Sequence, residues 1–251
     1  MEIIGRGFIA QHVAAIADRH PGVRLLAAGV SRTTTAGEAD FRRERELLER
    51  AIEAGRRDGR QVVFLSTASS GVYAAEGCAG REEEAVPATR YARHKLSLER
   101  LLTGSGVDHL VLRLSHLVGA HQQPWQLVPS LVAQLRTGRV RLWREARRDL
   151  LDVRHMVWIT DALLTAGVRG EVVNVASGHP VPVEEIVAHL AHRLGLSAEP
   201  EWVDRADPGV ISVAKLHRLA PGVRGLGFGP DYFRGVLDAR LAADHGVASG
   251  R

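Results

Sequence analysis

The chain is poor in cysteine and in long apolar runs, and each scarcity excludes a class of protein. Cys78 is the only cysteine among 251 residues, so no disulfide can form within the chain. No apolar run approaches the roughly 20 residues that cross a membrane. The first residues also lack the basic and apolar segments of a signal peptide. We therefore expect a cytoplasmic protein with no membrane partner.

Basic residues outnumber acidic ones, and the formal net charge is +4 at pH 7. Such a charge can indicate binding to nucleic acid. However, the densest basic run, residues 42–60, is interleaved at helical spacing with four glutamates, Glu44, Glu46, Glu49 and Glu53. This pattern is typical of a solvated helix face. We expect no nucleic-acid partner.

Lysine is scarce as well, because Lys95 and Lys215 are the only two among 33 basic residues. Lys95 stands four residues after Tyr91, so on a helix the two side chains share one face. A cation beside the phenol favours the phenolate, which lowers the tyrosine pKa and provides a proton donor near neutral pH. An accidental pair on a surface helix is the alternative. In a chain that otherwise uses arginine, we favour a catalytic pair.

A glycine-rich turn follows the first apolar residues. Glu2, Ile3 and Ile4 precede Gly5-Arg6-Gly7-Phe8-Ile9-Ala10, and a helical pattern continues to Ala17. Glycines allow the backbone to approach a diphosphate, and the amides at the start of a helix bind anions. The sequence predicts a strand, a dinucleotide-binding turn and a helix, although an ordinary strand-to-helix turn has the same pattern.

The next apolar run, residues 23–31, predicts a strand that is buried on both faces. Chains that bind NAD usually carry an acid after the second strand to hold the ribose hydroxyls. Here no acid occurs before Glu38, and the nearby charges are Arg6 and Arg32. Guanidinium groups suit a 2′-phosphate, which favours NADPH. A helix from Asp40, its N-cap, to Ala54 should follow and end at Gly55.

A further buried strand, residues 61–65, ends in hydroxyl side chains: Ser66, Thr67, Ser69 and Ser70. Small hydroxyl residues are common in turns. At the carboxyl edge of a parallel sheet, one of them could also hydrogen-bond a substrate carbonyl. The polar loop that follows, residues 74–90, is expected to be exposed.

The remaining pattern alternates strands and helices, which predicts an α/β fold with a parallel sheet. We expect strands at residues 110–114, 139–143 and 172–175, a helix at 184–194 and a helical tail from Lys215. Residues 122–135, with two prolines, suit a cap that leaves the sheet, and residues 147–153 should return to the core. This predicts a dinucleotide-binding core of residues 1–120 with 147–178. Residues 121–146 with 179–251 would form the cap.

The order of these motifs resembles the extended short-chain dehydrogenase/reductase family, of the NAD-dependent epimerase/dehydratase type. The chain looks most like the nucleotide-sugar 4-ketoreductases of antibiotic deoxysugar pathways. Four segments carry the resemblance: Leu65-Ser66-Thr67-Ala68-Ser69, Tyr91-Ala92-Arg93-His94-Lys95, Arg113-Leu114-Ser115-His116-Leu117-Val118-Gly119 and Asn174-Val175-Ala176-Ser177-Gly178.

The resemblance implies NADPH-dependent reduction of the 4-keto group of a nucleotide-linked 4-keto-6-deoxyhexose, with no metal. Tyr91 would donate the proton, and Lys95 would activate it and bind the nicotinamide ribose. Thr67 or Ser69 would steady the carbonyl oxygen, and we favour Thr67 because it continues a strand. The implied cofactor-binding residues are Gly5, Arg6, Gly7, Phe8, Ile9, Ala27, Ala28, Gly29, Arg32, Tyr91, Lys95 and Leu114. The implied substrate-binding residues are Ser69, Ser70, His116, Gln126 and Arg148, with Arg148 on the diphosphate. We also expect a dTDP-linked substrate and a homodimer.

Two features depart from the family pattern. Residues 27–31 look like the strand on the nicotinamide side, so the Rossmann-like sheet would be truncated by two strand-helix units. Arg6 is then the better candidate for a 2′-phosphate. In addition, His116 stands where many relatives have asparagine; it could still donate a hydrogen bond, or it could merely fill a strand-end pocket.

Other functions remain open on the sequence. A nucleotide-sugar 4-epimerase or a 4,6-dehydratase would keep the fold, although Ala68 and Ser69 replace the Asp-Glu pair of relatives that dehydrate. A ketoreductase for an aromatic polyketide would suit the short cap. A non-catalytic NADP-binding sensor is disfavoured, because such proteins commonly lose the Tyr-Lys pair.

Overall fold

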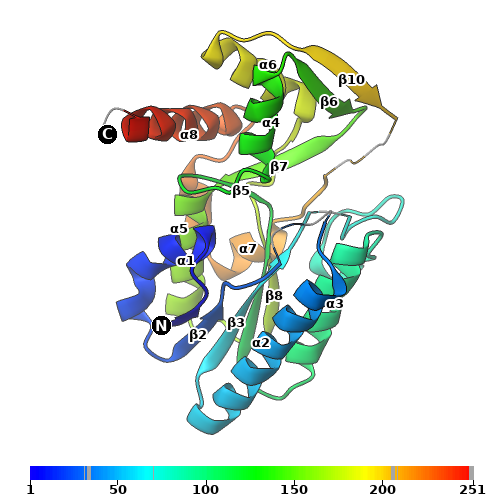
Figure 1. The fold of residues 1–251 in the computed structure, drawn as a ribbon. Helices are drawn as coiled ribbons and strands as arrows, with labels where there is room; N and C mark the ends of the chain where they lie inside the picture. The colour runs from blue at the N-terminus through cyan, green and yellow to red at the C-terminus, as the bar shows by residue number, and fades with distance from the viewer. Residues whose placement is uncertain (31, 33–34, 70, 205–206, 208, 249–251) are drawn as a thin grey trace.

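A five-stranded parallel sheet organises one half of the molecule in the computed structural model, which describes residues 1–30, 32, 35–69, 71–204, 207 and 209–248 (Figure 1). Its strands lie in the order β1 (Glu2–Ile4), β2 (Val23–Leu26), β3 (Gln61–Thr67), β4 (His109–Leu114) and β8 (Glu171–Val175). Each pairs in parallel with its neighbour. All five carboxyl ends therefore meet at one edge.

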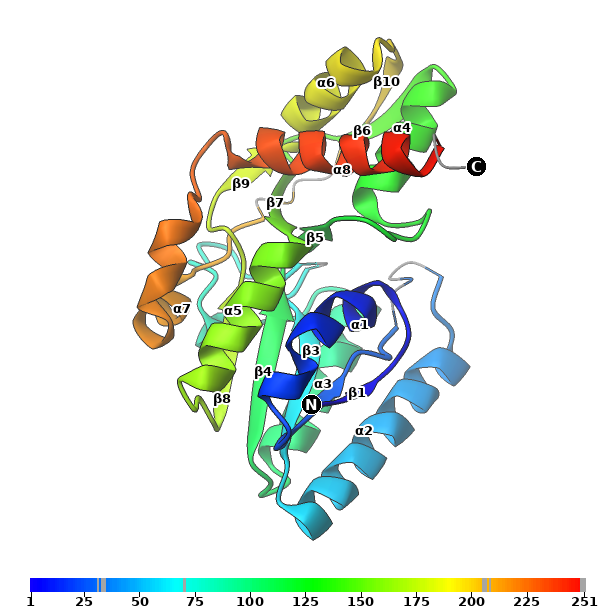
Figure 2. The same ribbon diagram turned by 90° about the vertical axis from the view of Figure 1, so that its left-hand side faces the viewer.

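Helices cover both faces of this sheet (Figures 1 and 2). Val62 and Phe64 of β3 pack in one apolar cluster with α2 (Glu38–Asp58) and α3 (Arg90–Thr103). The alternate residues, Val63 and Leu65, pack in another cluster with α1 (Phe8–Val13) and α5 (Val153–Thr165). Successive side chains of a strand point to opposite faces, so a strand between two helical layers is apolar throughout. The predicted α/β fold with a Rossmann-like parallel sheet is confirmed.

The strand order follows the chain order, and β1 lies at the edge of the sheet. In an ordinary doubly wound sheet the first strand lies inside, with strands on both of its sides. Here β2 pairs with β1 on one side and with β3 on the other. This order fits the truncated sheet expected from the sequence.

A second group of elements stands above the carboxyl edge of the sheet (Figure 1). Strands β5 (His116–Val118), β7 (Arg147–Asp152) and β9 (Pro180–Pro182) form one small sheet, and β6 (Arg139–Trp143) pairs with β10 (Glu199–Val203). They share an apolar core with α4 (Leu127–Arg136), α6 (Val183–Leu194) and α8 (Tyr232–Ala248). The short helix α7 (Ala214–Leu219) returns to β8. Three 3₁₀ turns, Ala14–Arg19, Glu82–Glu84 and Pro221–Leu226, complete the elements.

The predicted ends of the α2 helix are wrong. The N-cap is Gly37, and Asp40 lies three residues inside, where its carboxylate accepts a hydrogen bond from the Gly37 amide at 3.1 Å. Gly55 lies inside the helix and does not end it. The missing side chain of Gly55 allows the helix to pack closely against Val62. The helix ends at Gly59, whose φ of 70° is left-handed, as is typical of a C-terminal glycine.

Three other expectations also differ from the structure. Strand β2 ends at Leu26, and Ser31 of the predicted strand lies outside the described residues. Residues 147–152 pair in the small sheet, although Leu151 and Val153 pack in the core of the large sheet as expected; α5, which begins at Val153, is a helix that the sequence did not predict. The loop predicted to be exposed contains Glu82, whose side chain is buried. Within the described ranges, no helix is long and apolar enough to cross a membrane.

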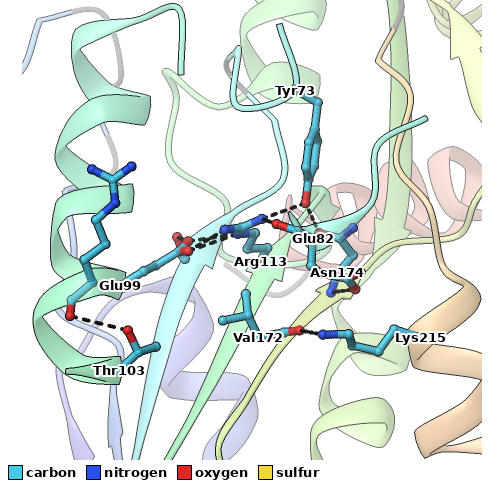
Figure 3. Close-up of polar contacts among 10 residues, drawn as sticks. Tyr73, Glu82, Glu99, Thr103, Arg113, Val172, Asn174 and Lys215 are labelled. Carbon is cyan, nitrogen blue, oxygen red and sulfur yellow. Dashed lines mark hydrogen bonds and ion pairs between the residues drawn. The ribbon is translucent and has the colours of Figure 1, made fainter. Parts of the chain in front are cut away.

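A buried ion pair fixes α3 against the sheet (Figure 3). Arg113 of β4 donates from Nη2 to Oε2 of Glu99 on α3 at 2.6 Å and from Nε to both carboxylate oxygens at 3.0 and 3.1 Å. Ser66 of β3 also donates to Glu99. One carboxylate therefore joins a helix to two neighbouring strands.

The other side of the guanidinium holds the loop that precedes α3 (Figure 3). Nη1 of Arg113 donates to the Glu82 carbonyl at 2.8 Å and to the Tyr73 hydroxyl at 3.0 Å. Tyr73 donates in turn to Oδ1 of Asn174 on β8 at 2.5 Å. The backbone amide of Asn174 donates to the Glu82 carboxylate at 2.9 Å. This network explains why Glu82 is buried.

Replacing Glu99 by Gln should lower the free energy of unfolding by about 3–5 kcal/mol, because a buried guanidinium would lose its charged partner. Urea unfolding measures this loss. The control is Glu46→Gln, an exposed position on α2, which should change stability by at most about 0.5 kcal/mol. A loss below about 1 kcal/mol for Glu99→Gln would contradict the assigned role of the pair.

Candidate active site

The carboxyl ends of β2, β3 and β4 open into a cavity of about 540 Å³. This volume is typical of sites for small molecules and cofactors. The cavity wall contains most of the residues that the sequence analysis proposed: Gly7, Phe8, Ile9, Ala27, Gly29, Thr67, Ser69, Tyr91, Lys95, Leu114, His116 and Gln126. Gly5, Arg6, Ala28, Arg32 and Arg148 do not line it. Ser70 lies outside the described residues.

The glycine turn crosses closely over the end of β2. A Cβ on Gly5 would lie 2.7 Å from the carbonyl carbon and oxygen of Ala27, and the φ of Gly5 is +137°, where L side chains are strained. The Ala27 amide donates to the Ile4 carbonyl at 2.8 Å. A Cβ on Gly7, by contrast, would meet nothing within 4 Å. The turn is therefore tight against the protein at Gly5 and open to the cavity at Gly7, which fits the approach of a dinucleotide backbone.

Tyr91 lies in the first turn of α3, whose N-cap is Thr89. The Thr89 hydroxyl accepts a hydrogen bond from the Ala92 amide at 3.0 Å, as in other helix N-caps. The Tyr91 side chain is 9% exposed, and its hydroxyl donates to the Val30 carbonyl at 3.2 Å. The phenol is thus fixed at the cavity wall before any ligand binds.

Lys95 lies one helical turn further along the same face. Its Nζ donates to Oε1 of Glu44 at 2.8 Å and to the Leu65 carbonyl at 2.7 Å, and it lies 4.4 Å from the centre of the Phe64 ring. The other lysine, Lys215, has a comparable partner, because it donates to the Val172 carbonyl at 3.1 Å (Figure 3). Both lysines of the chain therefore bind backbone carbonyls of the central sheet.

Glu44 is a site residue that the sequence analysis missed. Its side chain is completely buried, and its second oxygen, Oε2, lies 2.9 Å from Nε2 of His94. The sequence analysis assigned Glu44 to a solvated helix face, and this is wrong. One signal could have found it, since Phe41, Glu44 and Leu48 follow at spacings of three and four and place Glu44 on the apolar stripe of α2.

The predicted direction of the Tyr91 pKa is reversed in the structure. Burial raises the pKa of the phenol, and the Glu44 carboxylate also raises it, against the lowering effect of Lys95. Burial likewise opposes ionisation of Glu44, but Lys95 and His94 lower the pKa of Glu44 to about 2. Burial disfavours the charged form of Lys95, and Glu44 outweighs it and raises the pKa of the ammonium. Lys95 and Glu44 are therefore a charged pair at neutral pH.

The two candidate hydroxyls lie side by side. Thr67 is the last residue of β3, opposite Leu114 of β4, and its Oγ1 is 3.0 Å from Oγ of Ser69. The Ser69 amide also donates to Oγ1 of Thr67 at 3.1 Å. Ser66 has a different role, since it donates to Glu99 in the buried network. Thr67 is fixed by the sheet, whereas Ser69 follows the strand.

His116 and Gln126 line the side of the cavity that faces the cap. Burial, and to a lesser extent the charge of Arg148, lowers the pKa of His116 to about 3, so its ring is neutral at pH 7. Its Nδ1 is buried and has no hydrogen-bond partner among the described residues. Gln126 precedes α4 and accepts a hydrogen bond from the Gln123 amide at 2.7 Å.

A second hollow, of about 770 Å³, adjoins the first. Trp125 and Leu127 line both of them. Three guanidinium groups line the second hollow, from Arg32, Arg141 and Arg148. Arg32 lies over the Trp125 ring at 4.1 Å, and Arg148 pairs with Asp207 at 3.0 Å. This partner of Arg148 comes from a distant segment of the chain.

The chain also matches the model of the NAD dependent epimerase/dehydratase family over residues 9–176, more than half of its length. The chain belongs to this family. It is thus a member of a family of NAD-dependent enzymes. No curated protein matches the chain.

Several solved structures share the fold at low sequence identity. A UDP-galactose 4-epimerase superposes with a TM-score of 0.80 and 21% identity over 97% of this chain and 99% of that one. MoeE5 in complex with UDP-glucose and NAD superposes with a TM-score of 0.79 and 20% identity over 99% of this chain and 100% of that one. RMD from Pseudomonas aeruginosa, complexed with NADPH, superposes with a TM-score of 0.75 and 21% identity over 96% of this chain and 97% of that one. These similarities establish the fold; MoeE5 holds UDP-glucose and NAD, and RMD holds NADPH.

Within this epimerase/dehydratase site, Thr67→Ala and Ser69→Ala should have unequal effects on turnover. Thr67→Ala should lower it by a factor on the order of 10² to 10³, the cost of removing a hydrogen-bond donor from a developing oxyanion. Ser69→Ala should cost less, and Thr67→Ser, which keeps the hydroxyl, should retain most of the activity. Steady-state kinetics of the three variants checks this. Small and equal losses for both alanine variants would show that neither hydroxyl polarises the substrate.

Proposed function

We propose that this chain reduces the 4-keto group of a nucleotide-linked 4-keto-6-deoxyhexose with NADPH. The observation that supports it is that one cavity at the carboxyl edge of the sheet joins the glycine turn, the Tyr91 phenol, Lys95 and the Thr67 hydroxyl. When bound, NADPH supplies the hydride that the carbonyl carbon gains, and it leaves as NADP⁺. Gly5, Gly7 and the end of β2 would hold the cofactor.

The protein's own groups complete the reduction. The Thr67 hydroxyl hydrogen-bonds the carbonyl oxygen and keeps it near Tyr91. Tyr91 gives its proton to this oxygen as the alcohol forms, and the phenolate then regains a proton from water. Lys95, held by Glu44 and the Leu65 carbonyl, stabilises the phenolate between these steps.

The substrate assignment rests on the second hollow and on the ligands of solved relatives. MoeE5 was solved with UDP-glucose, and the hollow beside Trp125 carries the guanidinium groups of Arg32, Arg141 and Arg148. Guanidinium forks suit a diphosphate. We propose that Arg148 binds the diphosphate in exchange for Asp207. We propose in addition that the nucleotide is dTDP, that the enzyme is a homodimer, and that residues 121–146 with 179–251 act as the substrate domain.

Tyr91→Phe should lower turnover by a factor on the order of 10² to 10⁴ with little change in folding, because only the proton donor is lost. NADPH oxidation in the presence of a freshly prepared 4-keto-6-deoxy sugar nucleotide measures it. Tyr232→Phe is the control, since that hydroxyl contacts Asp152 and His155 and not the cavity. Wild-type turnover in Tyr91→Phe would refute the assignment. Turnover without added NADPH, by protein purified with a bound nicotinamide, would indicate a 4-epimerase instead.

The cofactor preference should depend on Arg6. Arg32 stacks on Trp125 beside the second hollow, whereas Arg6 is an exposed residue of the glycine turn. A guanidinium on a 2′-phosphate contributes about 1.5 to 3 kcal/mol, so NADPH should be preferred over NADH by roughly 10-fold to 150-fold. Arg6→Ala should remove most of this preference, and Arg32→Ala should leave it unchanged. Equal dissociation constants of the wild type for NADPH and NADH would exclude the 2′-phosphate contact.

A further inference from the structure

The most unusual feature of the site is a carboxylate behind the lysine. Glu44 belongs to α2, and its side chain is 0% exposed, while that of Lys95 is 3% exposed. The oxygen-to-nitrogen distance is 2.8 Å. Two charges this close and this far from water interact strongly, because no solvent screens them. The Lys95 charge is therefore already balanced before a ligand enters.

The neighbours of the Glu44 carboxylate fix it in place. His94 of α3 lies 2.9 Å from Oε2, and its ring stacks on Phe41 of α2 at 4.4 Å between centroids. On the third side, Gly29 follows β2, and a Cβ there would lie 2.5 Å from Oε1 of Glu44. Because Gly29 has no Cβ, the carboxylate can lie this close to the backbone, and its two oxygens have separate partners, Lys95 and His94. Its position next to Lys95 is a fixed part of the fold.

The titratable side chains around Tyr91 and Lys95 come from few elements. Lys95, His94 and Glu99 lie on its own helix, and Glu44 comes from α2. Glu99 is neutralised by Arg113, with Nη2 and Oε2 at 2.6 Å. Tyr91 and Lys95 also bind the backbone carbonyls of Val30 and Leu65, and these carbonyls carry no charge. Glu44 is therefore the carboxylate that balances Lys95.

We propose that Glu44 is a positioning residue that anchors the Lys95 ammonium and balances its charge, so that Tyr91 keeps its proton and acts as an acid. A lone ammonium would favour the phenolate, which is the base that alcohol oxidation requires. A neutralised ammonium favours the phenol, which is the acid that ketone reduction requires. The catalytic part of this inference rests on the proposed function. It adds a reason why Tyr91 would carry the proton that ketone reduction requires at neutral pH.

The first test needs no substrate. Tyrosinate formation is followed by ultraviolet absorbance during alkaline titration, and the Tyr91 contribution is obtained by subtracting the titration of Tyr91→Phe. In Glu44→Gln the Tyr91 midpoint should fall by about one to three pH units, because the ammonium acts unopposed. Glu46→Gln, an exposed position on the same helix, should leave the midpoint unchanged. An unchanged midpoint in folded Glu44→Gln would overturn the proposal.

Glu44→Asp keeps the charge, but its side chain is one methylene shorter, so the carboxylate lies further from Lys95. This variant provides a second measurement if Glu44→Gln does not fold. It should shift the midpoint in the same direction by a smaller amount, and no shift would count against the proposal. With the ketone substrate, the alkaline limit of the reduction rate should move to lower pH in Glu44→Gln. The acidic limit of the reverse alcohol oxidation should move to lower pH with it, because both depend on the same tyrosine. A shifted tyrosine midpoint in a protein that does not reduce the sugar would keep the role of Glu44 and refute the substrate assignment.

Discussion

The ion pair between Arg113 and Glu99 determines how α3, the helix of Tyr91 and Lys95, sits on the sheet. Tyr91, Lys95 and Glu99 follow at intervals of four residues, so they share one face of α3. With Glu99 bound to Arg113 of β4 and to Ser66 of β3, this face can point only toward the sheet. The same contact keeps Tyr91 and Lys95 at the ends of β2 and β3. Because both ions are buried, the helix cannot rotate without leaving a charge unpaired.

The sequence was sufficient for features whose signals are local. Apolar runs predicted the buried strands, the glycine turn predicted the start of the fold, and Tyr91 with Lys95 predicted a helix that faces the site. Contacts between distant segments had no such signal. Glu44 and Lys95 are separated by 51 residues, and Arg148 pairs with Asp207, which lies far along the chain. A local pattern can place Glu44 on the apolar stripe of its helix, but it does not identify the partner that this carboxylate meets across the fold.

The tyrosine shows why a motif alone predicts the wrong electrostatics. From Tyr91 and Lys95 only, the cation should lower the pKa of the phenol. In the folded chain, burial and the Glu44 carboxylate outweigh the cation. The effect of one charge depends on all the groups packed around it and on their distance from water. Two chains with the same Tyr-x-x-x-Lys motif can therefore differ in how readily their tyrosine loses its proton.

Gly29 adds a constraint on how this site can change over evolutionary time. The space that a side chain at position 29 would need is filled by Oε1 of Glu44, 2.5 Å from the site of a Cβ. A larger residue at position 29 alone would therefore clash with Glu44, and replacing Glu44 alone would remove the charge pair with Lys95. Substitution of both positions together avoids the clash. Among homologous chains, glycine at position 29 and a carboxylate at position 44 should be inherited together. A homologue with a larger residue at 29 should carry a shorter or neutral side chain at 44.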